Sequence, residues 1–219
     1  MSRVRVHNLS ISLDGFAAGE DPSTEAPLGR GGERLHEWVL ATRFGHRLLG
    51  EAGGSEGVDD AFAWRTEDGI GAAIMGRGTF GPQAGPWTDL GTDDEWRGWW
   101  GERPPFGTPV YVLTHHPRPP LVMDGGTVFH FVDARPPEVL ALATDAAGGL
   151  DVRLGGGATT VREFLAADLV DLLHVVRVPV VLGRGARLWD DLAGLEERFE
   201  IEQVASPSGV VHLTFTRRT

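Results

Sequence analysis

The chain has 219 residues, of which 41% are hydrophobic and 23% charged, and its formal net charge is −11 at pH 7. It contains no cysteine, and all 20 basic residues are arginine. These counts exclude disulfides, thiolate nucleophiles, cysteine-ligated metals, Schiff-base lysines and a Walker A loop with its lysine. The acidic balance argues against a nucleic-acid partner, which needs a basic face, and no apolar run is long enough to cross a membrane.

The length and composition are those of one globular domain spanning residues 1–219. No Pro/Ser/Gly-rich linker divides the chain into self-sufficient halves. The N-terminal stretch that begins at Met1 alternates like a strand and lacks the apolar region of a signal peptide, so we expect a cytoplasmic protein.

Apolar periodicity predicts strands that alternate with helices along most of the chain. The predicted strands cover residues 4–13, 72–75, 109–114, 127–132, 152–154, 170–182, 198–206 and 210–217. The predicted helices cover residues 33–49, 58–68, 136–147 and the stretch after Gly157. This order predicts a three-layer α/β/α fold, in which helices cover both faces of a mostly parallel central sheet that ends in an antiparallel hairpin.

Three local features qualify this pattern. In the first strand the apolar parity changes between Val6 and Leu9, which indicates a bulge near His7-Asn8 or burial on both faces. The residues around Ser55 match a G-x-S-x-G nucleophile elbow, but they follow a helix instead of a strand, so we interpret them as a flexible connection. The tryptophan-rich stretch 87–100 is expected to be a loop that covers the domain.

A run of three glycines, Gly155-Gly156-Gly157, separates the short apolar strand 152–154 from the helix that follows. Glycines let a ligand approach the backbone, and a helix N-terminus favours negative charge, so this turn suits a phosphate. Thr159 or Thr160 could cap the helix. The alternative is a tight strand-to-helix connection that binds nothing.

Four candidate segments follow predicted strands: Asp14-Gly15, Gly76-Arg77, His115-His116 and the three glycines at 155–157. Ligands of open α/β sheets bind beyond the carboxyl ends of the strands. We therefore expect these segments to lie on one rim.

Five motifs in this order resemble the dihydrofolate-reductase-like superfamily, in particular the branch named for the C-terminal reductase domain of bifunctional riboflavin-biosynthesis enzymes. The motifs are Ser12-Leu13-Asp14-Gly15, Gly76-Arg77-x-Thr79-Phe80, Val112-Leu113-Thr114-His115, Gly155-Gly156-Gly157 and Pro179-Val180-Val181-Leu182-Gly183-x-Gly185. The stretch from Gly32 to Trp38 is similar to stand-alone bacterial members. The resemblance implies an NADPH-dependent reductase that acts on a small molecule, and a homodimer, because relatives commonly dimerise.

The resemblance also implies roles for individual residues. Gly76, Arg77, Gly78 and Thr79 would hold a phosphate at a helix start, although Arg77 could also be an ordinary surface arginine. Residues near the adenosine ribose and its 2′-phosphate would be Thr114, His115 and His116, which could instead form only an exposed loop. The pyrophosphate would be held by Gly156, Gly157, Ala158 and Thr159. The nicotinamide end would be approached by Leu13, Asp14 and Ala17, with Gly183 lining the same crevice or merely turning the chain.

The sequence departs from the family at one point of the glycine run. Pathway reductases of this branch carry Glu-Gly-Gly where this chain has Gly155-Gly156-Gly157, and the resemblance places that glutamate in their active site. Its loss weakens the case for a pyrimidine substrate. The acid on the first helix of dihydrofolate reductase aligns with neither Glu33 nor Glu37, so folate reduction is unsupported as well.

The sequence therefore predicts hydride transfer from NADPH to a small heteroaromatic or carbonyl substrate. Asp14 is the first candidate proton donor, followed by His36 and Glu37; Asp14 could instead only form its turn. Trp38 could stack on a flat substrate, although its helical spacing favours the core. Two rival functions remain: a nucleotide-binding or sensor protein without turnover, and a hydrolase built on Ser55.

Overall fold

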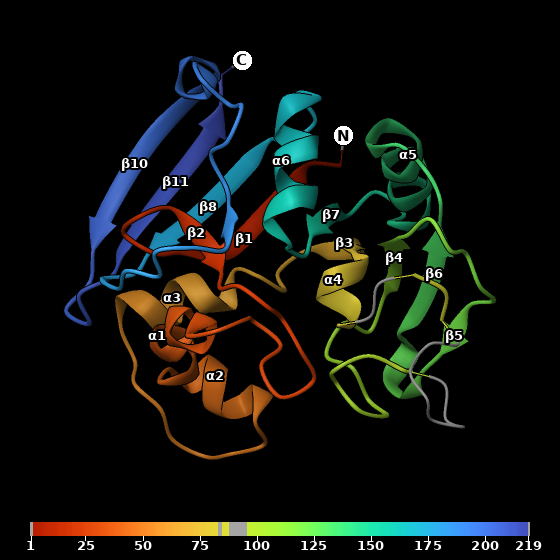
Figure 1. Ribbon diagram of the computed structural model, residues 1–219, viewed down its shortest axis with the longest axis horizontal. Helices are drawn as coiled ribbons and strands as arrows, with labels where there is room; N and C mark the ends of the chain where they lie inside the picture. Colours follow the sequence, from red (N-terminus) through yellow and green to blue (C-terminus); the bar gives the residue numbers. More distant parts are fainter. Residues whose placement is uncertain (1, 83–84, 88–95, 219) are drawn as a thin grey trace. The chain divides into compact units, whose positions relative to one another are not determined.

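The computed structural model describes residues 2–82, 85–87 and 96–218. The chain divides into two compact units (Figure 1). The first unit comprises Met1–Val4 and Gly69–Leu169, and the second comprises Arg5–Asp68 and Val170–Thr219. The single domain expected over residues 1–219 stays a prediction.

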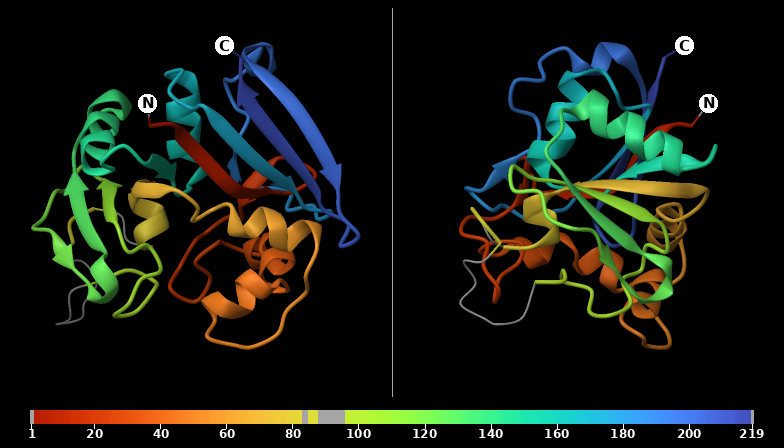
Figure 2. Two further views of the ribbon diagram at one scale, coloured as in Figure 1. Left: turned by 180° about the vertical axis from the view of Figure 1, so that it is seen from behind. Right: turned by 90° about the vertical axis from the view of Figure 1, so that its right-hand side faces the viewer.

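The first unit is built on a mostly parallel sheet with the strand order β7-β3-β4-β6-β5 (Figure 2). Its strands are β3 (Ile70–Gly76), β4 (Pro109–Leu113), β5 (Leu121–Val122), β6 (Val128–Val132) and β7 (Asp151–Leu154). The first four strands in this order pair in parallel, and β5 pairs antiparallel with β6. Four successive residues of β3 are buried, as expected for a parallel strand covered on both faces.

The helices of the first unit are α4 (Arg77–Phe80), a 3₁₀ turn at Asp124–Gly126, α5 (Pro136–Ala146) and α6 (Ala158–Ala166). Helix α5 starts where predicted because Pro136 occupies its first turn and the Glu138 carboxylate accepts the Arg135 backbone N–H at 2.9 Å. Its buried positions are Val139 and Ala143, which lie one turn apart on the same face.

The tryptophan-rich stretch packs against the core of the first unit. Trp87, Trp96 and Trp100 contact a buried cluster that includes Phe80 and Phe129. Aromatic side chains of this size contribute a large part of the stabilising apolar area. The predicted covering role is confirmed for these three tryptophans, and residues 88–95 lie outside the described part of the chain.

The sheet of the second unit has the order β10-β11-β8-β1 (Figure 1). Its strands are β1 (Val4–Ile11, all but its first residue in this unit), β8 (Leu172–Arg177), β10 (Phe199–Ala205) and β11 (Val211–Arg217). Strands β1 and β8 are parallel, and β10 and β11 form the predicted antiparallel C-terminal hairpin. A separate antiparallel ladder joins β2 (Phe16–Ala18) to β9 (Ala186–Arg187); neither strand was predicted.

The predicted bulge in β1 is confirmed. The register of β1 on β8 shifts between Val6 and Leu9. Asn8, inside this interval, has φ 56°, a left-handed conformation that few side chains other than Asn and Asp tolerate. The change of apolar parity in the sequence therefore marked a real irregularity of the backbone.

The single helix predicted over residues 33–49 is wrong. The segment forms a 3₁₀ turn (Gly32–Leu35), α1 (Glu37–Leu40) and α2 (Arg43–Leu48), and α3 (Val58–Trp64) follows. Thr42 causes the break between α1 and α2, because its hydroxyl accepts a hydrogen bond from the Gly45 N–H at 3.0 Å and donates one to the Val39 carbonyl at 2.6 Å. A threonine that caps a new helix cannot continue the preceding one.

Two other predicted elements are shorter than expected. The strand predicted over 170–182 ends at Arg177, before Pro179, and the helix predicted over 58–68 ends at Trp64. A last 3₁₀ turn, Leu195–Arg198, precedes β10. The α/β class, the mostly parallel sheet and the closing hairpin are confirmed. None of the helices within the described ranges has the length and apolar character needed to span a bilayer.

Candidate cofactor-binding site

Three strands of the first unit end side by side at one edge of its sheet. Gly76, the last residue of β3, pairs with Leu113 at the end of β4. On the other side of β3, Ile74 pairs with Leu154 at the end of β7, and the Gly155 N–H donates to the Ile74 carbonyl at 2.7 Å. The segments that follow these strands, which begin at Arg77, Thr114 and Gly155, are thus neighbours, as the parallel order predicts.

The glycine run forms an open backbone turn. Gly156 has φ +115°, and a Cβ built on it would have no heavy atom within 4 Å. Gly157 has φ +82°, and a Cβ there would lie 3.0 Å from the hydroxyl oxygen of Thr79. Both conformations favour glycine. The turn therefore leaves space beside Gly156 and lets the loop approach α4 closely at Gly157.

Helix α6 begins at this turn without a side-chain cap. Its N-cap is Gly157, which as a glycine has no side chain that could cap the first turn. The expectation that Thr159 or Thr160 caps the helix is therefore wrong: both lie inside it, and Thr159 is exposed while Thr160 is buried. The N–H groups of the first turn, beginning with Ala158, have no partner within a helix and are suited to an anion.

Gly76 is required by the packing of α6 on β3. A Cβ on Gly76 would overlap the hydroxyl oxygen of Thr160. The glycine at the end of β3 therefore brings the first turn of α6 against the strand. Sequence reasoning assigned Gly76 to a phosphate, and the structure adds this packing role.

Arg77 starts α4 and reaches toward the end of β4. Its Nη1 donates to the Thr114 hydroxyl at 3.4 Å, and its guanidinium carbon lies 3.8 Å from the ring centroid of Trp87. Thr114 is buried, and its hydroxyl also accepts the His116 N–H at 3.1 Å. Gly78, in the same helix turn, is exposed and has open space at its Cβ position. One positive charge is therefore fixed at the edge where the strands end.

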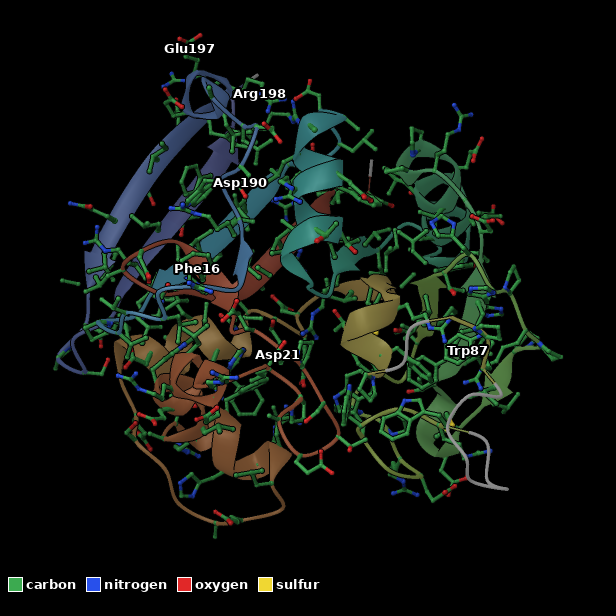
Figure 3. The ribbon with its side chains drawn as sticks, in the orientation of Figure 1. Phe16, Asp21, Trp87, Asp190, Glu197 and Arg198 are labelled. Atoms are coloured by element: carbon green, nitrogen blue, oxygen red, sulfur yellow. The ribbon has the colours of Figure 1, made fainter. Side chains whose placement is uncertain are left out.

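Trp87, which is labelled in Figure 3, contacts the guanidinium groups of both Arg77 and Arg118 and was missed by sequence reasoning. The guanidinium of Arg118 is 4.0 Å from its ring centroid, and its indole N–H donates to the His116 carbonyl. Cation–π contacts of this kind hold the arginines in place. Arg118 follows the predicted strand 109–114 closely, but a single arginine in a proline-rich stretch carried no signal of this contact.

His115 forms an exposed pair with Asp133. Its Nδ1 lies 3.1 Å from a carboxylate oxygen of Asp133, with side chains that are 92% and 57% exposed. Asp133 directly follows β6, the strand beside β4. Asp133 could have been found from the sequence. The strand 127–132 was predicted, and ligands of open α/β sheets bind beyond the carboxyl ends of the strands.

In the second unit, Asp14 is held by backbone N–H groups. One carboxylate oxygen accepts the Leu182 N–H at 3.1 Å, and the other accepts the Gly183 N–H at 2.7 Å. The Arg187 guanidinium donates to the Asp14 carbonyl at 3.0 Å. Hydrogen bonds from the Ser12 hydroxyl and from these N–H groups lower the pKa of Asp14 to about 2. Asp14 is ionised at neutral pH, which favours the turn-forming alternative over a proton donor.

Leu13 and Gly183 adjoin this carboxylate. Leu13 precedes Asp14 in the chain and is 56% exposed, and its N–H donates to the Val180 carbonyl at 2.8 Å. Gly183 has φ +81° and open space at its Cβ position, and Ala17 lies in β2. The structure thus brings Leu13 and Gly183 together with Asp14 in the second unit, which also contains Ala17, and the remaining predicted cofactor residues together in the first.

His36 and Glu37, the other proposed proton donors, lie at the start of α1. Burial lowers the pKa of His36, a hydrogen bond to the backbone of Gly32 acting in the opposite sense. His36 is therefore neutral at pH 7 and has no acidic proton to give as an imidazolium. Glu37 is exposed.

Trp38 belongs to the core of the second unit. It is 5% exposed and packs with Leu35, Val176 and Val178. Its indole N–H donates to the Ser10 hydroxyl at 2.9 Å. The predicted substrate-stacking role is corrected to a core role, because no ring face is open to a ligand.

Ser55, the nucleophile of the hydrolase alternative, does not lie in a nucleophile elbow. Ser55 follows α2 and its hydroxyl donates to the Ala41 carbonyl at 3.1 Å. A nucleophile elbow needs a strand before the serine.

Within the described part of the chain, no three His, Asp or Glu side chains form a group that could hold a metal ion.

Several solved structures match the chain at low sequence identity. A protein of Shewanella sp. PV-4, provisionally named a riboflavin biosynthesis protein, matches with 20% identity, a TM-score of 0.59 and full coverage of both chains. RibD of Acinetobacter baumannii matches at 15% identity and a TM-score of 0.52; all of this chain covers 59% of that protein. Dihydrofolate reductase of Enterococcus faecalis, solved with NADP(H), matches at 15% identity over 100% and 96% of the two chains, with a TM-score of 0.49.

No curated protein matches the chain. The family model described as the RibD C-terminal domain matches residues 5–213, which is nearly the whole chain and leaves out only the first residue of β1 and the end of β11 among the elements described above. Membership of this family supports a reductase role. The chain belongs to the RibD C-terminal domain family.

Proposed function

We propose that the chain is an NADPH-dependent reductase that transfers hydride to a small heteroaromatic or carbonyl substrate. The observation that carries the proposal is the gathering of an open glycine turn, an uncapped helix N-terminus and a fixed arginine at one edge of the first unit. These are the features that bind the phosphates of a dinucleotide.

The residues at this edge fit the cofactor. The space beside Gly156, which a side chain would fill, would admit the pyrophosphate, and the first N–H groups of α6 would bind it. Arg77, with its guanidinium against Trp87 and Thr114, would bind the 2′-phosphate as a planar donor. When bound, NADPH supplies the hydride, and the protein supplies position and electrostatics. Leu13, Ala17 and Gly183 keep the nicotinamide-end role as part of the proposal.

Gly156→Val tests the placement of the pyrophosphate. The new side chain would occupy the space beside the turn, so we expect NADPH affinity to fall at least about tenfold, which corresponds to about 1.4 kcal/mol. Fluorescence titration with NADPH measures the affinity. Gly149→Val is the matched control, because Gly149 also has a positive φ, +92°, and open space, and lies in the turn before β7. If the two variants bound NADPH with equal affinity, the glycine turn would not be part of the binding site.

A second candidate function, a nucleotide-binding or sensor protein without turnover, is favoured by one observation. Of the three proposed proton donors, Asp14 is ionised and His36 is neutral at pH 7, so neither holds an acidic proton. Reduction of a substrate would then need a proton from a different donor on the substrate side, such as a water molecule.

Oxidation of NADPH in the presence of a substrate panel separates the two functions. The panel contains pterins, quinones and aldehydes, and absorbance of the reduced nicotinamide is followed with and without protein. Turnover of any of these compounds, lost in Gly156→Val and kept in Gly149→Val, supports the reductase. Tight NADPH binding with no oxidation across the panel supports the sensor.

A further inference from the structure

A chain of buried hydrogen bonds runs through the second unit from the bulge of β1, and the ring of Trp38 lies 5.2 Å from one of its members, His212. The Asn8 N–H donates to Nδ1 of His174 at 3.2 Å. Nε2 of His174 lies 3.1 Å from Nδ1 of His212, and Nε2 of His212 lies 2.8 Å from a carboxylate oxygen of Asp59. The two histidine side chains are 1% and 0% exposed. The chain connects the bulge of β1, strands β8 and β11, and helix α3.

The two ends of this chain determine where its protons lie. A backbone N–H can only donate, so Nδ1 of His174 must accept from Asn8, and the ring proton of His174 is on Nε2. That proton is donated to Nδ1 of His212, which leaves the proton of His212 on Nε2, directed at Asp59. Both imidazoles are therefore neutral, with the same tautomer. An additional proton on either ring would place two donors face to face.

The surroundings of the two imidazoles oppose a positive charge. The ring of Phe62 is stacked on both, at centroid distances of 4.7 Å to His174 and 4.2 Å to His212. Arg65 lies over the same phenylalanine, with 4.5 Å from its guanidinium carbon to the ring centroid. The ring of His7 from β1 is 6.2 Å from that of His174.

Asp59 is the one acidic group facing the pair within the described part of the chain, while Arg65 and His7 are the basic ones. Burial and the neighbouring His212, His7 and Arg65 lower the pKa of His174 to about 2. Burial also lowers the pKa of His212, with Asp59 acting in the opposite sense. Burial would raise the pKa of Asp59, but hydrogen bonds from His212 and from two serines of the β10–β11 turn lower it overall.

We propose that Asn8, His174, His212 and Asp59 form an acid-sensitive latch, which ties the β1 bulge and the C-terminal hairpin to α3 while both imidazoles are neutral and weakens when either is protonated. The bulge leaves the Asn8 N–H without a ladder partner, and the latch supplies one. Asn8 holds its left-handed conformation at this point. Each hydrogen-bond donor of the latch faces an acceptor only while both imidazoles are neutral, so the latch stabilises the fold in that protonation state alone.

The direction of the pH dependence follows from the lowered histidine pKa values. The unfolded chain binds protons at its histidines below pH 6.5, the ordinary pKa of histidine, whereas in the folded chain the pKa of His174 is lowered to about 2 and that of His212 is lowered as well. The latch therefore contributes fully above pH 6.5 and its contribution is lost as the pH falls below it. Each histidine protonated only in the unfolded state changes the folding equilibrium about tenfold per pH unit.

Imidazole NMR of the full-length protein tests the protonation pattern directly. With histidine labelled by ¹⁵N, two-bond ¹H–¹⁵N spectra between pH 8 and pH 5 report the tautomer and charge of each ring. We expect His174 and His212 to stay neutral with the proton on Nε2 throughout. A proton on Nδ1 of either ring, or a titration midpoint between pH 6 and 7 for either, would overturn the proposal.

Urea unfolding at pH 6 and pH 5 tests the coupling to stability. We expect the wild-type folding constant to fall about tenfold more over this interval than that of His174→Gln, and also more than that of His212→Gln, because each variant lacks one titrating group. His130→Gln, in the first unit and outside the latch, should keep the wild-type pH dependence. A wild-type pH dependence in both latch variants contradicts the proposal; if they do not fold, the wild-type NMR spectrum decides.

Discussion

The carboxylate of Asp14 receives one backbone N–H at each oxygen, from residues 168 and 169 positions away in the sequence. Asp-Gly is an ordinary turn pair, and the sequence pattern predicted the turn correctly. The partners Leu182 and Gly183 have no local relation to it. The sequence could not show that the Asp14 carboxylate is stabilised as an anion, because only the folded backbone shows which groups surround its charge. Its role as a proton donor stays a prediction.

Asp14→Asn should destabilise the protein at pH 7. The amide would place a donor against one of the two N–H groups, and we expect a loss of about 1 kcal/mol, since water screens this partly exposed group. The pKa of Asp14 is lowered from 3.8 to about 2, so its contribution is present above pH 3.8 and is lost as the pH falls toward 2. Urea unfolding at pH 7 and at pH 2.5 measures the difference. A fall in kcat of about 10²–10⁴-fold with unchanged stability would instead support the proton-donor role.

Trp38→Phe should lower stability with little effect on substrate affinity. The variant leaves the Ser10 hydroxyl without its donor and opens space in the core, for an expected cost of about 2 kcal/mol. Trp64→Phe is the control, because Trp64 is 42% exposed and should change stability much less. Chemical denaturation of both variants gives the comparison. A raised KM in Trp38→Phe at wild-type stability would contradict the core role.

At the scale of elements, the sequence predicted strands more accurately than the first helix. Strand positions depend on short apolar runs and flanking turns, and β3, β6 and the β10–β11 hairpin were located within one or two residues. The stretch 33–49 has helical spacing throughout, but its continuity is broken by a hydroxyl. Thr42 could be read from the sequence either as a buried helix residue or as a cap, and the choice depends on tertiary packing.

Thr42→Ala should destabilise α2 without extending α1. Loss of the N-cap hydrogen bond to Gly45 is expected to cost about 1 kcal/mol. Ser55→Ala, which removes an exposed hydroxyl bonded to Ala41, is the control and should cost less. Urea midpoints of the two variants test this, and a Thr42→Ala variant as stable as wild type would show that packing alone sets the break between α1 and α2.

The Ser55→Ala variant also tests the hydrolase alternative. An esterase activity of the wild-type protein that Ser55→Ala abolishes would show that Ser55 is a nucleophile after all.

At the scale of the whole molecule, ligand binding is coupled to stability. A dinucleotide that binds only the folded chain raises the free energy of unfolding by about 2.7 kcal/mol at 100 times its Kd. For a chain of this length, that shift should raise the Tm by about 5–10 °C. Differential scanning fluorimetry with NADPH and with NADH measures it. The absence of any shift with NADPH at millimolar concentration would argue against the proposed cofactor.

The homodimer that the family resemblance implies also concerns the whole molecule, and it stays a prediction. Strand β10 is the edge of the second unit's sheet, and Ile201 and Val204 on it are 46% and 40% exposed. Exposed edges of this kind can pair with another chain. Light scattering after size-exclusion chromatography gives the mass, with twice 23.6 kDa expected.

The α/β class, the parallel strands, the closing hairpin and the glycine turns could be predicted from local patterns, because apolar periodicity and turn residues act over a few neighbouring positions. The same patterns placed Gly76, Arg77, Thr114 and the glycines 155–157 at strand ends, from which their proximity in the first unit follows. The stabilised charge of Asp14 and the burial of Trp38 became visible with the three-dimensional structure alone. It alone also joined His174 to His212, 38 residues apart. These outcomes depend on burial and on hydrogen-bond partners distant in the chain, and no local pattern encodes either.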